Sequence, residues 1–472
     1  MELIGASVVF VCDEEFSIIK NGGVLLENGC IIDVGKYDEL ESKLDFQVNK
    51  NISPNTQKPK LKSKKSKIAN ATYIKKQFFS DCVLLPALIN AHIHFEFGAN
   101  TASFAYGGFE AWLESVMSYR GDVLEKLDSV LSRQIATQLA SGVGSVGAIS
   151  SYGGDMLALA HCPLRVVYFC EALGANKHKA GEVFSHFKER FFNACELQEK
   201  LQNQRFMPRV AIHSPYSVCD ELAKQVVALA LQTQSNKNNQ KTSQKPIISA
   251  HFLESASERE WLESKSGWFK NFYETVLKIP NPKPFYSIDK FLELFSQAQA
   301  VLTHCIAMSE RELEMILEAG HFITTCPRSN RLLGGKMLDI ARFAKIKNYG
   351  LLSRLAIGTD GASSNVNTNM LDEMRAGLFG FGFLDSHKSS KAESNTSSKL
   401  ESIAKMLILS ATRYGAQALG LENGELKEEK YADLAVFKIP QIADSATPIL
   451  HFLTNATKAH RLYINGQIAL ES

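Results

Sequence analysis

The segment INAHIHFEF, residues 89–97, ends an apolar run, CVLLPALIN (82–90), with two histidines one residue apart. Side chains two positions apart on a β-strand point to the same face, so His92 and His94 can reach one common point. Neutral imidazole is a good ligand for zinc or ferrous iron. Taken alone, the pair fits a metal site and two ordinary strand histidines equally well.

Further segments repeat this arrangement of a short apolar run that ends in polar residues. They are VGSVGAIS (143–150), LRVVYFCEA (164–172), MPRVAIHS (207–214), PIISAHFLE (246–254), AVLTHC (300–305), GHFITTCPRSN (320–330) and RLAIGTDGASS (354–364). Stretches with helical spacing of Leu and Ile separate the runs, as in residues 124–142 and 309–320, and the second ends in Gly as a helix does. Eight β-then-α units predict a (β/α)8 TIM barrel, with a doubly wound sheet as the alternative.

The two ends of the chain have a different, β-rich character. Residues 3–38 alternate β-type runs with NGG and NGC turns, and YADLAVFKI (431–439) and RLYINGQIAL (461–470) are similar. Because chain termini often lie close together, these segments can pair into one small β-sandwich domain. The expected division is 1–83 and 423–472 for the β-sandwich and 84–422 for the barrel.

Two polar segments interrupt the pattern. Residues 43–67 contain eight Lys and one Asp, almost no aromatic residue and no Arg. This composition favours a solvated insertion between two strands over a tether for an anionic surface or nucleic acid. Residues 235–245, SNKNNQKTSQK, are expected to form a second loop.

The bulk composition narrows the possible partners. The chain has 472 residues, 45% of them hydrophobic, and a net charge of +2, which gives no reason to expect nucleic acid. The N-terminus lacks the pattern of a secretory signal, and no apolar run approaches the roughly 20 residues that span a membrane. The nine cysteines include no CxxC pair, which favours free thiols and a cytoplasmic location.

The polar residues at the ends of the predicted strands form a pattern of their own. In a (β/α)8 barrel, chemistry collects at the C-terminal ends of the strands. His213, His251, His304 and Asp360 end the fourth, fifth, sixth and eighth runs. A third histidine and a carboxylate would complete, with the first-strand pair, a metal site that leaves room for water. The sequence therefore predicts a metal centre on this face of the barrel.

Separated motifs along the chain resemble, in type and order, those of the amidohydrolase superfamily, in its branch of purine and nucleoside deaminases and chlorohydrolases. They are LLPALINAHIHFE, HSPYS, SAHFLES, LTHC, CPRSN and GTDGASSN. The resemblance covers the barrel and both terminal β segments. It implies a distorted (β/α)8 barrel, a small β-sandwich and a divalent metal ion. Zn²⁺ is the first expectation and Fe²⁺ the alternative, because both suit these ligands. One ion is expected, because the fourth strand does not end in the Lys that two-metal relatives often have.

The resemblance also implies roles for individual residues. The implied metal ligands are His92, His94, His251 and Asp360. The implied catalytic residues are Glu254, as the proton-shuttling glutamate of HFLE, and His304 and Asp360, which orient the nucleophilic water. His213 corresponds to a substrate-facing histidine. Without the resemblance, Glu254 could be a helix N-terminal carboxylate, His304 a core histidine and His213 a loop cap.

Candidates for substrate recognition follow from the same resemblance. Residues 109–122 resemble a lid over the substrate, in which Trp112 either faces the substrate or packs its own helix. Glu171 ends the third strand and suits ribose hydroxyls better than a carboxylate. Arg120 and Arg328 are candidates for an anionic tail, since Arg pairs bidentately with carboxylates, although Arg328 is equally compatible with a structural role.

The overall pattern resembles most the 6-amino-6-deoxyfutalosine deaminases of menaquinone biosynthesis. That resemblance implies hydrolysis of an adenine nucleoside with a 3-carboxyphenyl ketone tail, giving futalosine and ammonia. S-adenosylhomocysteine, methylthioadenosine and adenosine are alternative substrates, and a guanine deaminase, cytosine deaminase or chlorohydrolase is an alternative activity. A non-catalytic scaffold is disfavoured because every implied ligand is present. A homodimer is one expectation, since relatives commonly form one.

Overall fold

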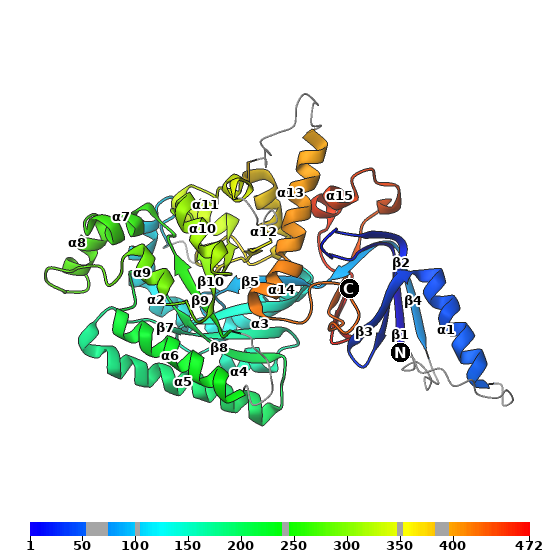
Figure 1. Cartoon of the computed structure of the whole chain (residues 1–472), viewed down its shortest axis with the longest axis horizontal. Coiled ribbons are helices and arrows are strands. Elements are labelled where there is room, and N and C mark those ends of the chain that lie inside the picture. The colour runs from blue at the N-terminus through cyan, green and yellow to red at the C-terminus, as the bar shows by residue number, and fades with distance from the viewer. Residues whose placement is uncertain (53–73, 100–103, 238–244, 347–352, 383–395) are drawn as a thin grey trace. The chain divides into compact units, whose positions relative to one another are not determined.

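The computed structural model describes residues 1–52, 74–99, 104–237, 245–346, 353–382 and 396–472 (Figure 1). They divide into two compact units. One unit combines Met1–Ala87 with Glu422–Ser472, and the other is Leu88–Leu421.

Among the described residues of the larger unit, eight parallel strands form one sheet whose spatial order follows the chain. They are β5 (Leu88–Ile93), β6 (Val143–Ser150), β7 (Arg165–Ala172), β8 (Phe206–Ile212), β9 (Ile247–Phe252), β10 (Gln299–His304), β11 (Phe322–Thr325) and β12 (Leu355–Ile357). Each strand coincides with one of the eight predicted runs, although β8 and β10 begin one residue before theirs. The barrel prediction is confirmed, and the doubly wound alternative is wrong because such a sheet reverses its strand order near the middle.

The seam between β12 and β5 closes the barrel through individual hydrogen bonds. Asn90 donates from Nδ2 to Thr359 Oγ1 at 2.8 Å and accepts from Thr359 N at 3.0 Å. A Cβ atom on Gly358 would lie 2.7 Å from both N and O of His92, so the two strands approach this closely only because residue 358 is glycine.

Helices surround the strands in this unit (Figure 1). They are α2 (Phe109–Glu125), α3 (Leu127–Ala140), α4 (Met156–His161), η1 (Lys177–Lys179), α5 (Ala180–Leu201), α6 (Asp220–Lys237), α7 (Ala256–Ser264), α8 (Trp268–Thr275), α9 (Ile288–Glu293), α10 (Glu310–Glu318), α11 (Pro327–Gly334), η2 (Ile340–Lys345), α12 (Met370–Gly380), α13 (Thr396–Ser410) and α14 (Arg413–Leu419). Their local signals are clear in α10, where Ser309 and Glu312 form a capping box and Gly320 follows the helix with φ 77°. Inside the barrel, Ile89, Val167 and Phe169 belong to a buried apolar cluster.

The smaller unit contains one mixed sheet that joins the two ends of the chain. Its strands are β1 (Glu2–Phe10), β2 (Ile18–Glu27), β3 (Cys30–Lys36), β4 (Lys75–Pro86), β13 (Leu434–Lys438), β14 (Arg461–Ile464) and β15 (Gln467–Glu471), and its helices are α1 (Tyr37–Ile52), η3 (Ile442–Asp444) and α15 (Pro448–Asn455). Their spatial order is β15-β14-β13-β4-β1-β2-β3. Antiparallel pairing of β13 with β4 joins the C-terminal to the N-terminal strands, so both termini build this small β domain as predicted.

The prediction of a loop over residues 43–67 is wrong for its first part, because α1 extends to Ile52. Tyr37, Leu40 and Leu44 recur with helical spacing and pack in a buried cluster with Leu3 and Leu25. The high Lys content of residues 43–67 predicted a solvated loop, so the apolar face of the helix was not recognised. Residues 53–67 lie outside the described part of the chain, as do residues 238–244 of the second predicted loop, whose first residues continue α6.

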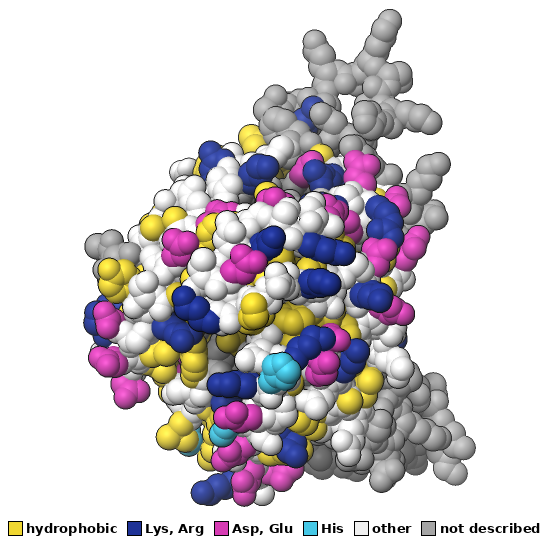
Figure 2. All heavy atoms as spheres, turned by 90° about the vertical axis from the view of Figure 1, so that its left-hand side faces the viewer, with side chains coloured by type: hydrophobic (Ala, Val, Ile, Leu, Met, Phe, Trp, Pro, Cys, Tyr) yellow, Lys and Arg dark blue, Asp and Glu magenta, His cyan; other side chains and the backbone are white. Residues whose placement is uncertain are grey.

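Charged and apolar side chains both appear on the face shown in Figure 2. Over the face shown in Figure 2, Lys and Arg side chains are interspersed with Asp and Glu. Within the described ranges, none of the helices combines the length and hydropathy needed to cross a membrane.

Candidate active site

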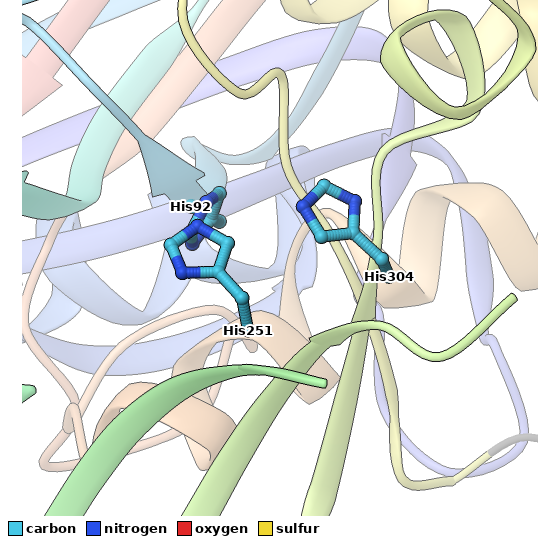
Figure 3. Close-up of side chains that lie close together, drawn as sticks. All are labelled: His92, His251 and His304. Carbon is cyan, nitrogen blue, oxygen red and sulfur yellow. The ribbon is translucent and has the colours of Figure 1, made fainter. Parts of the chain in front are cut away.

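Histidines from the ends of β5, β9 and β10 converge on one point, and Figure 3 shows three of them, His92, His251 and His304, close together. Nε2 of His94 lies 3.2 Å from Nε2 of His92 and 3.2 Å from Nε2 of His251. Two imidazole nitrogens bound to one zinc ion at about 2.0–2.1 Å in tetrahedral geometry are roughly 3.3 Å apart. The three rings are therefore spaced as ligands of a single ion.

The other ring nitrogens of two of these histidines have partners that orient the rings. Nδ1 of His92 lies 3.1 Å from Thr303 Oγ1, and Nδ1 of His251 lies 3.0 Å from the carbonyl oxygen of His213. Such contacts hold the proton on Nδ1 and leave the Nε2 lone pair free. Burial is the main reason that the pKa values of His92 and His251 are well below normal, so both rings are neutral, as metal ligands must be.

Asp360 supplies a carboxylate beside the three rings. Its Oδ1 lies 3.6 Å from Nε2 of His94 and 3.9 Å from Nε2 of His92. Ser329 Oγ donates to Oδ2 at 2.7 Å, and Gly361 N donates to Oδ1 at 2.8 Å. Burial alone would raise the pKa of Asp360, but His94, His304 and His92 outweigh it, so the pKa is lowered and the carboxylate is ionised.

These four residues are the ones that the sequence predicts as ligands, and the structure brings them together. Three imidazoles and one carboxylate are a donor set that suits Zn²⁺ or Fe²⁺. Their role as ligands stays a prediction.

Glu254 and His304 lie next to the ligand cluster. Oε1 of Glu254 is 3.5 Å from Nε2 of His304, whose Nδ1 is 2.7 Å from Oδ1 of Asn330. Burial, and then the charge of Asp360, raise the pKa of Glu254 well above its usual value. The buried carboxyl group therefore keeps its proton to a higher pH than an exposed glutamic acid does, as a proton donor requires. Asn330, the partner that orients His304, was missed in the sequence, although it lies in the CPRSN motif.

A cavity of about 340 Å³ opens over this cluster. His94, His251, Glu254, His304 and Asp360 contribute to its lining. Its apolar wall comes from Phe97, Trp112, Leu113, Val116, Met117, Phe272 and Leu277. A space of this size matches the pockets that take drug-sized molecules.

Four predicted substrate contacts line the same cavity: Trp112, Arg120, Glu171 and His213. Nδ1 of His213 is 2.6 Å from Ser217 Oγ, and burial lowers the pKa of His213 to about 4, so the ring is neutral. The Trp112 indole donates to the Ser363 carbonyl at 3.1 Å, which ties the lid helix α2 to the loop after β12. These positions agree with contacts to a substrate, which stay predictions.

One carboxylate oxygen of Glu171, Oε1, lies 3.6 Å from Nδ1 of His251 but makes no hydrogen bond in the described structure. Ser151 Oγ donates to its Oε2 at 2.5 Å, whereas Oε1 is buried and has no hydrogen-bond partner among the described residues. Burial is the main cause that raises the pKa of Glu171. A ligand hydroxyl in the cavity would satisfy Oε1, because a buried polar atom without a partner is unfavourable.

Arg328 does not fit the predicted role as an anchor for an anionic tail. Its Nε donates to Glu373 Oε2 at 2.6 Å and its backbone N donates to Glu373 Oε1 at 2.7 Å. Its terminal nitrogens donate to Asn367 at 3.0 and 2.9 Å and to the Asn369 carbonyl at 3.1 Å. The guanidinium group is committed to this loop, which favours the structural alternative for Arg328 and leaves Arg120 as the cationic candidate.

Glu96, which the sequence leaves without a role, organises the loop after β6. Its carboxylate accepts hydrogen bonds from Ser151 N at 2.7 Å, Tyr152 N at 3.0 Å and Gly154 N at 2.9 Å. This loop presents Ser151 to Glu171. A single sequence carries no signal for such a contact beyond a charged residue next to the metal motif.

Comparisons with known proteins agree with the fold. The family model described as "Amidohydrolase family" matches residues 83–469. A Helicobacter pylori protein named adenosine deaminase is 36% identical over 469 residues, 99% of each chain. A Nitratiruptor protein named aminodeoxyfutalosine deaminase is 36% identical over 387 residues, 82% of this chain and 86% of its own.

Solved structures give the same result. The crystal structure of Helicobacter pylori aminofutalosine deaminase with methylthio-coformycin matches with a TM-score of 0.82 and 35% identity, covering 100% of both chains. A zinc-bound adenosine deaminase of Xanthomonas campestris, with a TM-score of 0.69 and 18% identity, supports the fold alone. The resemblance inferred from the motifs is confirmed by these matches, and the chain belongs to the amidohydrolase family.

Proposed function

We propose that this chain is a metal-dependent hydrolase that deaminates an adenine nucleoside, replacing the exocyclic amine with oxygen and releasing ammonia. One observation carries the proposal: a buried Glu254, whose pKa is raised well above its usual value, lies beside the His and Asp cluster at the base of a nucleoside-sized cavity. Purine deamination needs both a hydrolytic centre and an acid that protonates the ring. The names of the Helicobacter pylori and Nitratiruptor relatives support the same reaction.

The ion would be held by His92, His94, His251 and Asp360. Zn²⁺ and Fe²⁺ both accept imidazole and carboxylate ligands. We take Zn²⁺ as the first choice and Fe²⁺ as the second. When bound, the ion supplies a water molecule whose pKa is lowered toward neutrality. We expect one ion, because β8, the fourth barrel strand, does not end in the Lys that two-metal relatives often have there.

The chain's own residues carry the protons. Glu254 donates its proton to N1 of the purine as water adds at C6, and it then transfers the water's proton to the departing amine. His304 and Asp360 orient the water. Asp360, whose pKa is lowered, accepts the proton that the water loses as it adds and passes it to the Glu254 carboxylate, which delivers it to the amine, and the proton left on the C6 hydroxyl group then restores Glu254. General acid–base catalysis of this kind is worth about 10²–10⁴-fold in rate.

The walls of the cavity favour a nucleoside with an aromatic, anionic tail. The unpartnered Oε1 of Glu171 suits a ribose hydroxyl, and neutral His213 suits a purine edge. Trp112, Met117 and Phe272 offer an apolar surface, at whose edge Arg120 supplies the cation. 6-Amino-6-deoxyfutalosine combines all these features, so we assign it as substrate and futalosine, an intermediate of menaquinone biosynthesis, as product. Adenosine is the second candidate, because a relative that covers 99% of the chain bears the name adenosine deaminase.

Turnover of a substrate panel tests this proposal. Zinc-loaded protein is incubated with 6-amino-6-deoxyfutalosine, adenosine, methylthioadenosine, S-adenosylhomocysteine, guanine and cytosine, and ammonia release is measured. We expect the highest kcat/KM for 6-amino-6-deoxyfutalosine and none for the free bases. Absence of turnover with every adenine nucleoside would refute the function. A preference for adenosine would keep the reaction and change the substrate.

A further inference from the structure

Glu258, in the first turn of α7, holds the chain segment that carries Glu254. Its Oε1 accepts a hydrogen bond from Leu253 N at 3.0 Å, and its Oε2 accepts one from Glu254 N at 2.9 Å. The Glu258 side chain is fully buried. One carboxylate therefore fixes two consecutive peptide units, including that of the proton donor.

This contact differs from ordinary helix capping. Glu312 has the same position in α10, and its carboxylate accepts from the N-cap residue Ser309, which completes a capping box. In α7 the N-cap Ser255 accepts from Glu258 N at 3.1 Å. The Glu258 carboxylate, however, extends past the N-cap to the two residues before it. Capping of α7 alone does not require the Glu258 carboxylate to accept hydrogen bonds from Leu253 and Glu254.

The held turn has an unusual backbone. Leu253 has φ 47°, in the left-handed region that a branched side chain rarely adopts. Its carbonyl accepts from Ala307 N at 2.8 Å, so hydrogen bonds fix this residue on both sides. Non-glycine residues keep such a conformation only where the surroundings determine it. The turn directs Glu254 into the cavity, with Oε1 3.5 Å from Nε2 of His304.

We propose that Glu258 is a positioning residue for the deamination, which acts through the backbone of Glu254 to hold the Glu254 carboxyl group at the purine ring. The inference rests on the proposed function, in which Glu254 moves the proton. Glu258 itself touches neither substrate nor ion. Burial raises the pKa of this carboxyl group to about 8, and the hydrogen bonds from the two amides oppose that rise.

The variant E258Q tests the proposal, because an amide nitrogen cannot accept the second hydrogen bond. We expect kcat to fall about 10²-fold, with KM within about threefold and with unchanged metal content. The matched control is E263Q, on the same helix, where the half-exposed carboxylate pairs with Arg259 at 2.7 Å. E263Q should keep the wild-type kcat. Wild-type kcat in E258Q would overturn the proposal.

Two further measurements separate positioning from a general structural role. If Glu258 acts through Glu254, the double variant E254Q/E258Q should be no slower than E254Q, whereas independent effects would multiply. A coformycin-type transition-state analogue should bind E258Q about 10²-fold more weakly, and the product-like nucleoside inosine within about threefold of wild type. Multiplying effects, or equal weakening of both ligands, would overturn the proposal.

The outcomes distinguish this inference from the function on which it rests. Lack of turnover in the wild-type protein refutes the function, whereas an active wild type with a fully active E258Q refutes the positioning role alone. If E258Q does not fold, E258D replaces it, since it keeps the carboxyl group but is one methylene too short to reach both amides. The same fall in kcat in a folded E258D supports the role, and failure of both variants to fold overturns it.

Discussion

The backbone N–H of Asp360 donates a hydrogen bond to the carbonyl oxygen of His92 at 3.0 Å. This bond joins a residue three positions past the end of the last barrel strand, β12, to the first strand, β5. It also joins two of the four predicted metal ligands. Closure of the barrel and assembly of the metal site are therefore the same structural event.

Gly358 makes this closure possible, so G358A should damage the metal site. The added Cβ would lie 2.7 Å from the backbone N and O of His92, a distance that forces the strands apart. We expect a loss of metal affinity of about tenfold or more, since a separation of this kind moves two ligands at once. Metal content after dialysis against a fixed concentration of chelator measures it. The control is G334A, where a Cβ meets nothing within 4 Å, and equal metal retention in both variants would contradict the prediction.

Arg120 should discriminate between substrates by their tails. It lines the cavity and is exposed, so R120Q removes a cation without disturbing the core. We expect KM for 6-amino-6-deoxyfutalosine to rise about tenfold, because a charge-assisted hydrogen bond contributes roughly 1.5–3 kcal/mol, and KM for adenosine to stay unchanged. R133Q, on the exposed part of α3, is the control. An equal change for both substrates would assign Arg120 a role other than tail recognition.

Glu96 should act on substrate affinity through the loop after β6. Its carboxylate accepts from three backbone amides, and glutamine in E96Q cannot satisfy all three. Ser151 would then no longer hold Glu171, and KM for nucleosides should rise about tenfold with a smaller change in kcat. S151A, which removes only the hydroxyl bonded to Glu171, should raise KM in the same way. Loss of metal from E96Q would contradict this assignment.

Asp155 should make stability decrease as pH rises. Burial, and then the charge of Glu96, raise its pKa in the folded protein to about 8, whereas the unfolded chain titrates near 3.8. Below about pH 4 both states hold the proton, and between that value and pH 8 only the folded state does. The stabilising contribution is therefore present in acid and is lost as pH rises toward 8.

The variant D155N should remove this pH dependence, on the order of a few kcal/mol between pH 5 and 8. Its Oδ1 can still accept from Ser150 and Tyr168, which donate to Asp155 at 2.7 and 3.0 Å. Denaturant unfolding at several pH values measures the slope. D289N is the control, because the pKa of Asp289 is lowered, mainly by Arg311, and it does not titrate in this range. Parallel curves for wild type and D155N would contradict the prediction.

The sequence was sufficient for the barrel and for the residues at its strand ends. Alternation of apolar runs with helical spacing reports which segments are buried, and parallel strands bring His92, His251 and Asp360 to one face of the barrel. The burial pattern of a segment and the residue type at the end of a strand are both local properties, so they can be read from a single sequence.

The missed features depend on contacts that local patterns do not encode. Arg328 was a candidate for substrate binding because no local pattern pairs it with Glu373, which lies 45 positions away. The structure shows a hydrogen bond between the two side chains. Glu258 looks like a helix-capping residue until its actual hydrogen-bond partners are seen. The helix α1 was overlooked because its three apolar contacts stand among charged residues.

The most direct test of the central claim is the metal content and turnover of E254Q. Glutamine preserves the shape of the side chain and leaves all four predicted ligands in place, but it cannot shuttle a proton. We predict one equivalent of metal per chain, as in the wild type, and a fall in kcat of about 10²–10⁴-fold for deamination of the adenine nucleoside. Wild-type turnover in a metal-loaded E254Q protein would contradict the account.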